Sequence, residues 1–445
     1  MWCAVAATLK QQEDRAIRRL ALSRGITFFG GNASFWALSA ILYQQSHSPT
    51  LVAAAALASF SVPAALSPLA GLIGDRFDRR QVMIASELSG AFIFLAMALV
   101  VSPVALIGLR VVASVACAPM VPATSAALPG LVADDQLDRA NAAVSKAGTA
   151  GCLVGTAFAG LMLATAGGSW VFVANVVTFL ISAWLIASVK GDFRPTPSDH
   201  GRRLAAGFSF LRRSPILRPV TLAYGLIFIG IGVSIPAEIV VASEFGAGSL
   251  GFAGLIFLWG VGMLLGAAAA ERLSGHVRDI RVLSLAAVAL AVGFLAVGAA
   301  PIFAVALMGM ALGGVGEGLW EPAQNSLIQR RTPDGIRGRV LAGNEAVMQA
   351  GIAVGLLASG FVTSAAGASA AFTVAGGAAA IGTALLLGVR PNAELIATPP
   401  PTLRPLAEAR VGLRRTPSGT PPSQLARRSV SAAHVSSAPE LRPTT

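Results

Sequence analysis

Long apolar stretches alternate with short polar loops from about residue 23 to residue 389. An α-helix rises about 1.5 Å per residue, so about 20 apolar residues cross a hydrocarbon core of about 30 Å. The pattern therefore predicts an all-α membrane protein with twelve transmembrane helices. The expected spans are 23–44, 49–71, 83–101, 103–126, 142–166, 168–189, 218–241, 249–270, 281–299, 301–323, 342–365 and 368–389.

Positively charged residues are concentrated in every second loop. Clusters of Lys and Arg follow the second, sixth, eighth and tenth expected spans. The loops around 47–49, 101–103, 167–169, 243–249, 299–301 and 366–369 contain none. Because the cytoplasmic loops of membrane proteins retain Lys and Arg, this alternation also predicts that both termini lie in the cytoplasm. The clusters are Arg76, Arg79 and Arg80; Lys190, Arg194, Arg202, Arg203, Arg212 and Arg213; Arg272, Arg278 and Arg281; and Arg330, Arg331, Arg337 and Arg339.

The composition is that of a membrane protein. Apolar residues make up 55% of the chain and charged residues only 12%, about half of the ~25% found in soluble domains. The net charge of +12 would also suit a nucleic-acid-binding protein. The Arg residues, however, lie at the ends of loops, where lipid phosphates account for them, and aromatic residues are not interleaved with them. Membrane lipids rather than nucleic acids are therefore the expected partners.

The basic segment 190–217 separates two groups of six spans. An offset of 200 residues pairs Pro122-Ala123 with Pro322-Ala323, Asp134 with Asp334, Arg139 with Arg339, and Val82 with Val282. These identities support two halves related by a parallel repeat. The expected units are a cytoplasmic N-terminal segment (1–22), an N-terminal six-helix bundle (23–189), a cytoplasmic central loop (190–217), a C-terminal six-helix bundle (218–389) and a Pro-, Ser- and Thr-rich cytoplasmic tail (390–445) that is expected to be disordered.

The loop after the second span reads Gly71-Leu-Ile-Gly74-Asp75-Arg76-Phe-Asp78-Arg79-Arg80. It resembles Gly-x-x-x-Asp-Arg-x-Gly-Arg-Arg, the cytoplasmic signature of the major facilitator superfamily, with Asp78 in place of the second Gly. Together with two halves of six spans, the resemblance implies the major facilitator fold. It also implies a monomeric secondary transporter that moves a small molecule by alternating access.

The resemblance implies a cytoplasmic gate made of Gly71, Gly74, Asp75, Arg76, Arg79 and Arg80. Asp75 would face the start of the eleventh span near Gly343 and Asn344, because a helix N-terminus favours a carboxylate. The three Arg residues would pair with acids across the loop or with lipid phosphates. Glu345 lies at the same helix start and would compete for its dipole, and the sequence leaves open which acid prevails.

The fifth span contains Gly151-Cys-Leu-Val-Gly155-Thr156-Ala-Phe-Ala159-Gly160. This resembles the antiporter signature Gly-x-x-x-Gly-Pro-x-x-Gly-Gly, although Thr156 replaces the Pro and Ala159 replaces a Gly. The missing Pro weakens the inference of antiport. Packing of small residues between helices is the other explanation for Gly151, Gly155 and Gly160.

In this superfamily the first, fourth, seventh and tenth spans line the central pathway. Their polar and aromatic residues are therefore the candidates for contact with substrate or protons. These are Asn32, Trp36, Arg110, Glu238, Glu317, Trp320 and Glu321.

Each candidate also has a simpler explanation. Arg110 faces either the pathway or the outer interface by snorkelling. Glu317 and Glu321 either carry protons, as a carboxyl group in a dry cavity can, or pair with Arg residues at the inner interface. Trp36 and Trp320 either stack on a planar substrate or belong to an interfacial aromatic belt. Glu87, about one turn inside the third span, is expected to be a gate or interface charge.

The sequence also resembles the macrolide- and siderophore-efflux branch of this superfamily, in segments 128–132, 207–211 and 337–340. The expected function is export of a small amphipathic compound or drug across the plasma membrane in exchange for protons. A proton-coupled permease for another small solute and a non-transporting receptor remain as alternatives.

An enzyme is not expected, because no nucleophile with a base appears and the four His residues lie in loops or the tail. No phosphate-binding loop points to ATP, so the proton gradient is the expected energy source without a cofactor. Cys3, Cys117 and Cys152 share no metal-ligand spacing, so no metal site is expected.

Overall fold

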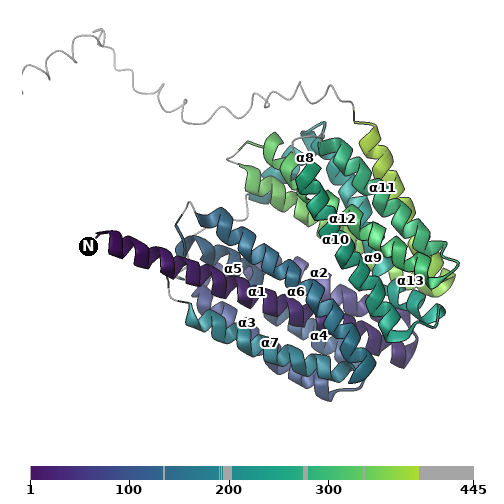
Figure 1. Cartoon of the computed structure of the whole chain (residues 1–445), viewed down its shortest axis with the longest axis horizontal. Coiled ribbons are helices and arrows are strands. Elements are labelled where there is room, and N and C mark those ends of the chain that lie inside the picture. The colour runs from purple at the N-terminus through teal and green to yellow at the C-terminus, as the bar shows by residue number, and fades with distance from the viewer. Residues whose placement is uncertain are drawn as a thin grey trace, which may run out of the picture. The chain divides into compact units, whose positions relative to one another are not determined.

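The structure is a computed structural model that describes residues 2–133, 136–189, 191, 193, 203–273, 279–333 and 336–389. Side chains at 2–12, 68, 71–72, 74–75, 138, 164 and 203–206 are not part of the description. The tail 390–445, most of the expected central loop, and the pair Asp134 and Asp334 lie outside it. All the regular elements in the described residues are helices (Figure 1).

The first half contains α1 (Trp2–Ser46), α2 (Pro49–Arg76), α3 (Arg79–Leu99), α4 (Pro103–Cys117), α5 (Met120–Ala127), the short 3₁₀ helix η1 (Leu128–Gly130), α6 (Leu137–Thr165) and α7 (Gly168–Ser188). Helix α8 (Arg203–Arg213) lies between the halves in sequence. The second half contains α9 (Leu217–Glu244), α10 (Gly248–Leu273), α11 (Asp279–Gly298), α12 (Phe303–Arg331) and α13 (Arg337–Leu387).

The all-helical class is confirmed, and eleven helices in the described residues are long and apolar enough to cross a membrane. The last of them, α13, combines two of the twelve expected spans, which join at Gly367. Gly367 has φ 83° and ψ 173° inside α13. Glycine has no Cβ and adopts this conformation at little cost, so the chain turns there without a loop.

The two halves follow one another at a constant offset of 200 residues. Helices α3, α4 and α6 begin at Arg79, Pro103 and Leu137, and α11, α12 and α13 begin 200 residues later in each case. The turn before the sixth helix of each half is also repeated, because Gly167 has φ 91° and Gly367 has φ 83°. The spacing that pairs Arg139 with Arg339 is therefore the true register of the repeat.

The cores of the halves keep the same aromatic contact. In the first half the ring centroids of Phe94 and Phe172 are 6.2 Å apart. In the second half those of Phe294 and Phe372 are 6.1 Å apart. All four side chains are buried. The repeat is therefore visible in packing as well as in the order of helices.

The fourth helix is where the halves differ most. In the first half it is broken into α4 and α5, whereas its counterpart α12 is continuous. Proline lacks the backbone N–H that a helix interior needs. The first half has Pro119 in addition to Pro122, and the second half has only Pro322 inside α12. The extra proline accounts for the break.

Helix α1 extends further than the expected first span. Residues before 23 were expected to form a separate segment, but α1 is helical from Trp2. Ala16, Ile17 and Leu20 are buried in a cluster with residues of α3, such as Met83. Three apolar residues on one side of the helix pack against the first half, so the helix continues beyond the apolar stretch.

We call the end of the bundle where α2 ends at Arg76 and α3 begins at Arg79 the basic face, and the end where α1 ends at Ser46 the opposite face. Several contacts join the two halves between their middle and the opposite face. The amide of Gln44 in α1 donates to Ser249 in α10 at 3.3 Å. The rings of Trp36 and Phe252 lie 5.6 Å apart, from α1 to α10.

Helix α8 packs against the second half near the basic face. A Cβ added at Gly207 of α8 would lie 2.1 Å from the carbonyl oxygen of Arg339 in α13. Leu211, one turn later, is buried in the core. The absence of a side chain at Gly207 therefore lets α8 lie directly on the backbone of α13.

Candidate functional site

The signature loop begins in α2 and ends in α3. The backbone of Gly71, Gly74 and Asp75 is helical, but their side chains lie outside the description. Asp78 is the N-cap of α3, and its carboxylate accepts hydrogen bonds from the backbone N–H groups of Arg80 at 2.9 Å and Gln81 at 3.1 Å. A carboxylate satisfies the unpaired N–H groups at a helix start and suits its dipole. This is the structural role of the Asp that replaces the usual Gly.

The Arg residues of this loop differ in their environments. Arg76 is exposed, whereas Arg79 is buried and donates to the carbonyl oxygen of Ala126 near the end of α5, at 2.8 Å. The Arg79 backbone N–H donates to the carbonyl of Phe193 at 3.2 Å, and the Arg80 guanidinium lies 5.8 Å from the centre of the Phe193 ring. Arg79 and Arg80 therefore hold α3 against α5 and the segment after α7.

The start of the eleventh span contacts α8, α9 and α12. Gly343 packs on α8, because a Cβ added there would lie 3.3 Å from Leu211. The side-chain oxygen of Asn344 accepts a hydrogen bond from Gln324 of α12 at 2.8 Å, and Asn344 is buried. Glu345 is exposed. Gly343 and Asn344 were expected to face Asp75, and this stays a prediction because the Asp75 side chain lies outside the description.

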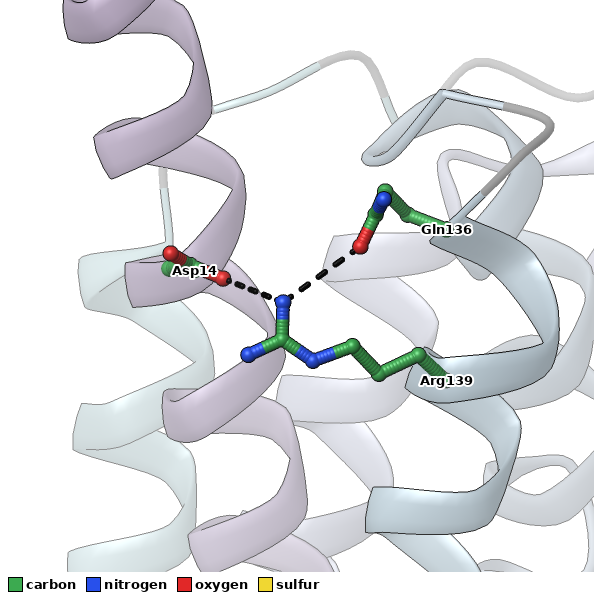
Figure 2. A network of polar contacts seen from close by, with 3 residues as sticks. All are labelled: Asp14, Gln136 and Arg139. Atoms are coloured by element: carbon green, nitrogen blue, oxygen red, sulfur yellow. Dashed lines mark hydrogen bonds and ion pairs between the residues drawn. The ribbon is translucent and has the colours of Figure 1, made fainter.

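A second polar contact at the basic face links α1 to α6 (Figure 2). Arg139 at the start of α6 donates from one nitrogen to Asp14 of α1 at 3.0 Å and to Gln136 at 3.4 Å. Both charged side chains are largely exposed, at 63% and 40%. An exposed pair of this kind contributes at most about 1 kcal/mol.

In the first half, Asn32 is joined to the altered antiporter signature. The Thr156 hydroxyl donates to the side-chain oxygen of Asn32 at 2.7 Å. Thr156 stands where the signature has Pro, so the substitution exchanges a bend for a hydrogen bond between α6 and α1. Trp36, one turn beyond Asn32, packs its ring on Phe252 of the other half.

Arg110 lies inside the first half rather than at its rim. Its Nε donates to the Ser59 hydroxyl of α2 at 2.7 Å, and its guanidinium is 5.8 Å from the centre of the Phe94 ring. Ser59 and Phe94 are buried, and Arg110 is half-buried. Arg110 thus makes these contacts with α2 and α3 in the interior of the first half.

Glu317 lies in the middle of α12, fourteen residues from Phe303 and fourteen from Arg331. The Trp259 indole N–H of α10 donates to its carboxyl oxygen at 2.7 Å. The Trp259 ring stacks on Phe294 at 5.5 Å, which fixes the direction of the N–H. Glycines at 313 and 314 let α12 approach the Trp259 ring and backbone closely. We find no ion pair to Glu317 among the described residues.

One cation considered as a partner of Glu317 is engaged elsewhere. Arg330 forms an ion pair with Asp279 at the start of α11, at 3.4 Å. Glu321, one turn beyond Glu317, is exposed. Glu238 of α9 is buried, one of its carboxyl oxygens has no partner in the described part of the chain, and it lies within range of the Glu317 charge. The second half therefore places two interacting acids between its helices.

In each half, one repeat-related residue of the second helix forms a hydrogen bond to an ionisable residue of the fourth helix. Ser59 and Trp259 differ by the repeat offset of 200, and each binds a charged residue of the fourth helix in its own half. The charge is the Arg110 guanidinium in the first half and the Glu317 carboxyl in the second. The candidates for the expected pathway therefore include a cation in the first half and an acid in the second.

Trp320 is not free to stack on a substrate in this conformation. It is 2% exposed, and its ring lies parallel to Tyr224 at a centroid distance of 5.9 Å. Its N–H donates to Gln324 at 2.7 Å. Gln324 in turn binds Asn344, so Trp320 belongs to a buried polar network of α12 and α13.

The three glycines of the fifth span are repeated in the eleventh. A Cβ added at Gly155 would lie 2.3 Å from the Phe29 carbonyl oxygen, and one at Gly355 would lie 2.2 Å from that of Ile229. The other two pairs behave alike. Gly151 and Gly351 lie against the carbonyls of Gly25 and Gly225, and Gly160 and Gly360 lie against Ala253 and Thr50 of the other half.

These contacts explain the span-five signature by packing. The first two glycines of each set lie on the first helix of their own half, and the third lies on the second helix of the other half. Because the eleventh span has the same arrangement, the glycines belong to the repeat and are no evidence for antiport.

Sequence reasoning missed Trp259, Ser59 and Gln324, which hold Glu317, Arg110 and Asn344. The repeat offset offered a signal, since it places Ser59 and Trp259 at one position. No group of three or more His, Cys, Asp or Glu residues suited to a metal ion is found in the described ranges.

Comparisons with known proteins complete the description of the site. The sequence profile of one family, described as "Transmembrane secretion effector", matches residues 12–400. The "Uncharacterized MFS-type transporter YfiS" of Bacillus subtilis (strain 168) is 26% identical over 270 residues, which are 59% of this chain and 65% of that protein. The "Enterobactin exporter EntS" of Escherichia coli O1:K1 / APEC is 25% identical over 282 residues, 61% of this chain and 66% of that one.

The chain thus spans just under two thirds of the length of these relatives. The crystal structure of the nucleoside transporter NupG superposes with a TM-score of 0.68 at 12% identity, over 84% of this chain and 98% of that one. At this identity the likeness concerns the fold alone.

Proposed function

The chain belongs to the transmembrane secretion effector family of the major facilitator superfamily, and on that premise we propose that it exports a small amphipathic compound in exchange for protons. It is a multi-pass membrane transporter of a small molecule and not an enzyme. We place it in the plasma membrane as a monomer, with the basic face and both termini in the cytoplasm. The proton gradient drives it, without a cofactor, and the Arg residues of the basic face bind lipid phosphates.

The direction of transport follows from two similarities. The family description names secretion, and a relative of 25% identity is named an exporter of enterobactin. Export requires that the substrate is taken from the cytoplasm or the inner leaflet. The contacts near the opposite face, such as Gln44 with Ser249, would hold the two halves together on the outer side at that stage.

Proton coupling rests on one observation, the half-buried hydrogen bond from Trp259 to Glu317 in the middle of the tenth span. A carboxyl group in an apolar setting with no paired cation exchanges a proton more readily than it holds a charge. Glu238 lies near enough to sense the charge on Glu317. Two acids that interact cannot both ionise easily, but a cationic group on an approaching substrate stabilises the carboxylates and so favours release of a proton.

The cation in the first half and the acids in the second suggest how the substrate is held. Arg110 offers a guanidinium from the first half, and Glu317 and Glu238 offer carboxyl groups from the second. Most of the other residues of these helices are apolar. A compound with an apolar body and at least one polar or charged group would suit this surface.

The proposal is tested in inside-out membrane vesicles with an imposed pH gradient. The substrates are enterobactin, ethidium and erythromycin, which differ in charge and size. We expect at least one compound to enter the vesicles and to release protons from their lumen as it does so. The Asp75→Asn variant should insert normally but transport more slowly, because the gate residue has lost its charge.

Two results would contradict the proposal. Uptake that needs no pH gradient would remove the proton coupling. Substrate movement in the same direction as protons would make the protein a symporter rather than an exchanger.

A further inference from the structure

A second buried carboxyl group, Glu87 of α3, takes no part in the function proposed above. Its side chain is 1% exposed. One carboxyl oxygen accepts hydrogen bonds from the hydroxyls of Thr27 in α1 and Ser182 in α7, each at 2.8 Å. The other oxygen is buried and has no partner among the described residues. A carboxylate in this setting lacks the bonds that stabilise its charge.

The groups around Glu87 come from three helices. Ser23 of α1 and Ser182 of α7 are hydrogen-bonded at 2.7 Å, which extends the cluster. The titratable groups nearby are Arg24 on α1 and the Cys117 thiol on α4, whereas the described residues of α7 supply only hydroxyls there. Arg79, at the start of α3, is bound to Ala126.

Arg24 is within range of the Glu87 charge but points elsewhere. Its guanidinium lies over the Phe28 ring, 4.1 Å from the ring centre. We find no ion pair to Arg24 in the described part of the chain. A cation over an aromatic face is held by at most a few kcal/mol, so it can leave for a carboxylate.

The second half shows that the fold does not need this cluster. At the offset of 200 residues, the counterparts of Ser23, Thr27, Glu87 and Ser182 are Ala223, Ile227, Ala287 and Gly382. The first three are buried in the apolar core, and a Cβ added at Gly382 would lie 3.3 Å from the Ala223 carbonyl oxygen. The same helices thus pack with apolar residues alone. The polar cluster in the first half is an addition to the scaffold.

We propose that Glu87 is a second proton-binding site, located in the first half of the transporter, and that Arg24 is the cation that replaces its proton. With Arg24 over Phe28, as here, the carboxyl group holds the proton on its unpartnered oxygen. On release, that O–H bond breaks and the proton passes to water. The guanidinium keeps its charge and moves from Phe28 to pair with the carboxylate.

This exchange would connect proton binding to the position of α1. Thr27 and Arg24 are three residues apart on α1, so they face the same side of the helix. The hydroxyl binds the acid in both states, and the guanidinium binds only the ionised form. Loss of the proton therefore draws α1 more tightly to α3 and α7. The proposal concerns a site other than Glu317 and does not depend on the direction of transport.

The test is pH-difference infrared spectroscopy on the purified full chain in lipid nanodiscs, between about pH 5 and about pH 9. We expect a carboxylic acid C=O band that disappears as the pH rises. The band should be absent from Glu87→Gln and present in Glu317→Gln, which removes the other acid. In Ser182→Ala the band should move to a higher frequency, because its oxygen has lost a hydrogen-bond donor.

Arg24→Gln tests the partner. Without the replacing cation, the band should persist at a pH at which it has gone from the wild-type spectrum. A wild-type spectrum that does not differ from that of Glu87→Gln over this range would overturn the site. If Glu87→Gln fails to fold, an unchanged band in Ser182→Ala would overturn it instead. Failure of pH-driven transport with the band intact would contradict the proposed exchange but not this site.

Discussion

The Trp259 indole donates a hydrogen bond of 2.7 Å to Glu317 across the interface of α10 and α12. Both residues are half-buried, and the two lie 58 positions apart in the chain. The bond places a carboxyl group at the centre of the second half and gives it a single neutral donor. Transport chemistry in this half should therefore depend on the pair rather than on Glu317 alone.

Substitution of Glu317 by Gln should abolish pH-driven exchange, because the amide cannot carry a proton. Trp259→Phe keeps the ring stacked on Phe294 but removes the donor. A hydrogen bond to a charged group contributes about 1.5–3 kcal/mol, so exchange should slow by about tenfold or more. The measurement is proton release in vesicles during substrate uptake. Glu321→Gln is the matched control, since Glu321 is exposed and its loss should leave the rate near the wild-type value.

Arg79→Gln should destabilise the first half, whereas Arg76→Gln should not. Arg79 is buried and bonded to the Ala126 carbonyl at 2.8 Å, and Arg76 is exposed. Loss of the buried charged hydrogen bond costs about 1.5–3 kcal/mol. Thermal unfolding in detergent, followed by the exposure of Cys117 to a thiol dye, compares the two variants. Equal melting temperatures would show that Arg79 serves the gate alone.

Gly155→Ala should lower stability far more than Gly148→Ala, although both glycines lie on α6. The added methyl group at 155 would lie 2.3 Å from the Phe29 carbonyl oxygen, and the one at 148 would have its nearest neighbour at 3.8 Å. Overpacking of this kind costs about 1–3 kcal/mol. The melting temperatures of the two purified variants, measured without denaturant, give the comparison. A Gly155→Ala protein as stable as Gly148→Ala would mean that α1 and α6 separate easily.

Gly360→Val should prevent the two halves from meeting near the opposite face. A Cβ at this position lies 3.1 Å from the Thr50 backbone of the other half, and valine adds two more methyl groups. We expect a cysteine at Ser249, which faces Gln44, to react faster with a membrane-impermeant maleimide in intact cells. Gly377→Val is the control, because no heavy atom lies within 4 Å of a Cβ at Gly377. A labelling rate that Gly360→Val leaves unchanged would show that Gly360 does not control the approach of the halves.

The helices of this fold could be predicted from the sequence because their signals are local. Apolar length gave the spans, and the offset that pairs Val82 with Val282 gave the true register of the halves. The turn at Gly367 falls between the expected spans 342–365 and 368–389, as the apolar pattern predicts. Helix α1 begins well before the expected first span, because Ile17 and Leu20 continue the buried side of the helix among charged residues.

The partners of the candidate residues could not be predicted in the same way. Trp259 looks like any apolar residue of its span, and only the packing of α10 on α12 turns its N–H toward Glu317. Trp320 stood out as an aromatic residue of the tenth span, yet Tyr224 covers its ring. Such contacts depend on the rotation of each helix about its axis, which the spacing of apolar residues in a nearly all-apolar span does not specify.

The packing of α8 on α13 determines where the chain can be divided into two fragments that still assemble. Gly207 fits against the Arg339 backbone and Leu211 enters the core, so α8 belongs with the second half. A cut between Phe193 and Arg203 would keep α8 with the second half and the contacts of Phe193 with Arg79 and Arg80 in the first. A cut after Arg213 would separate α8, which packs on Gly343, from the C-terminal fragment. Two separately synthesised polypeptides should therefore recombine in the first case and aggregate in the second.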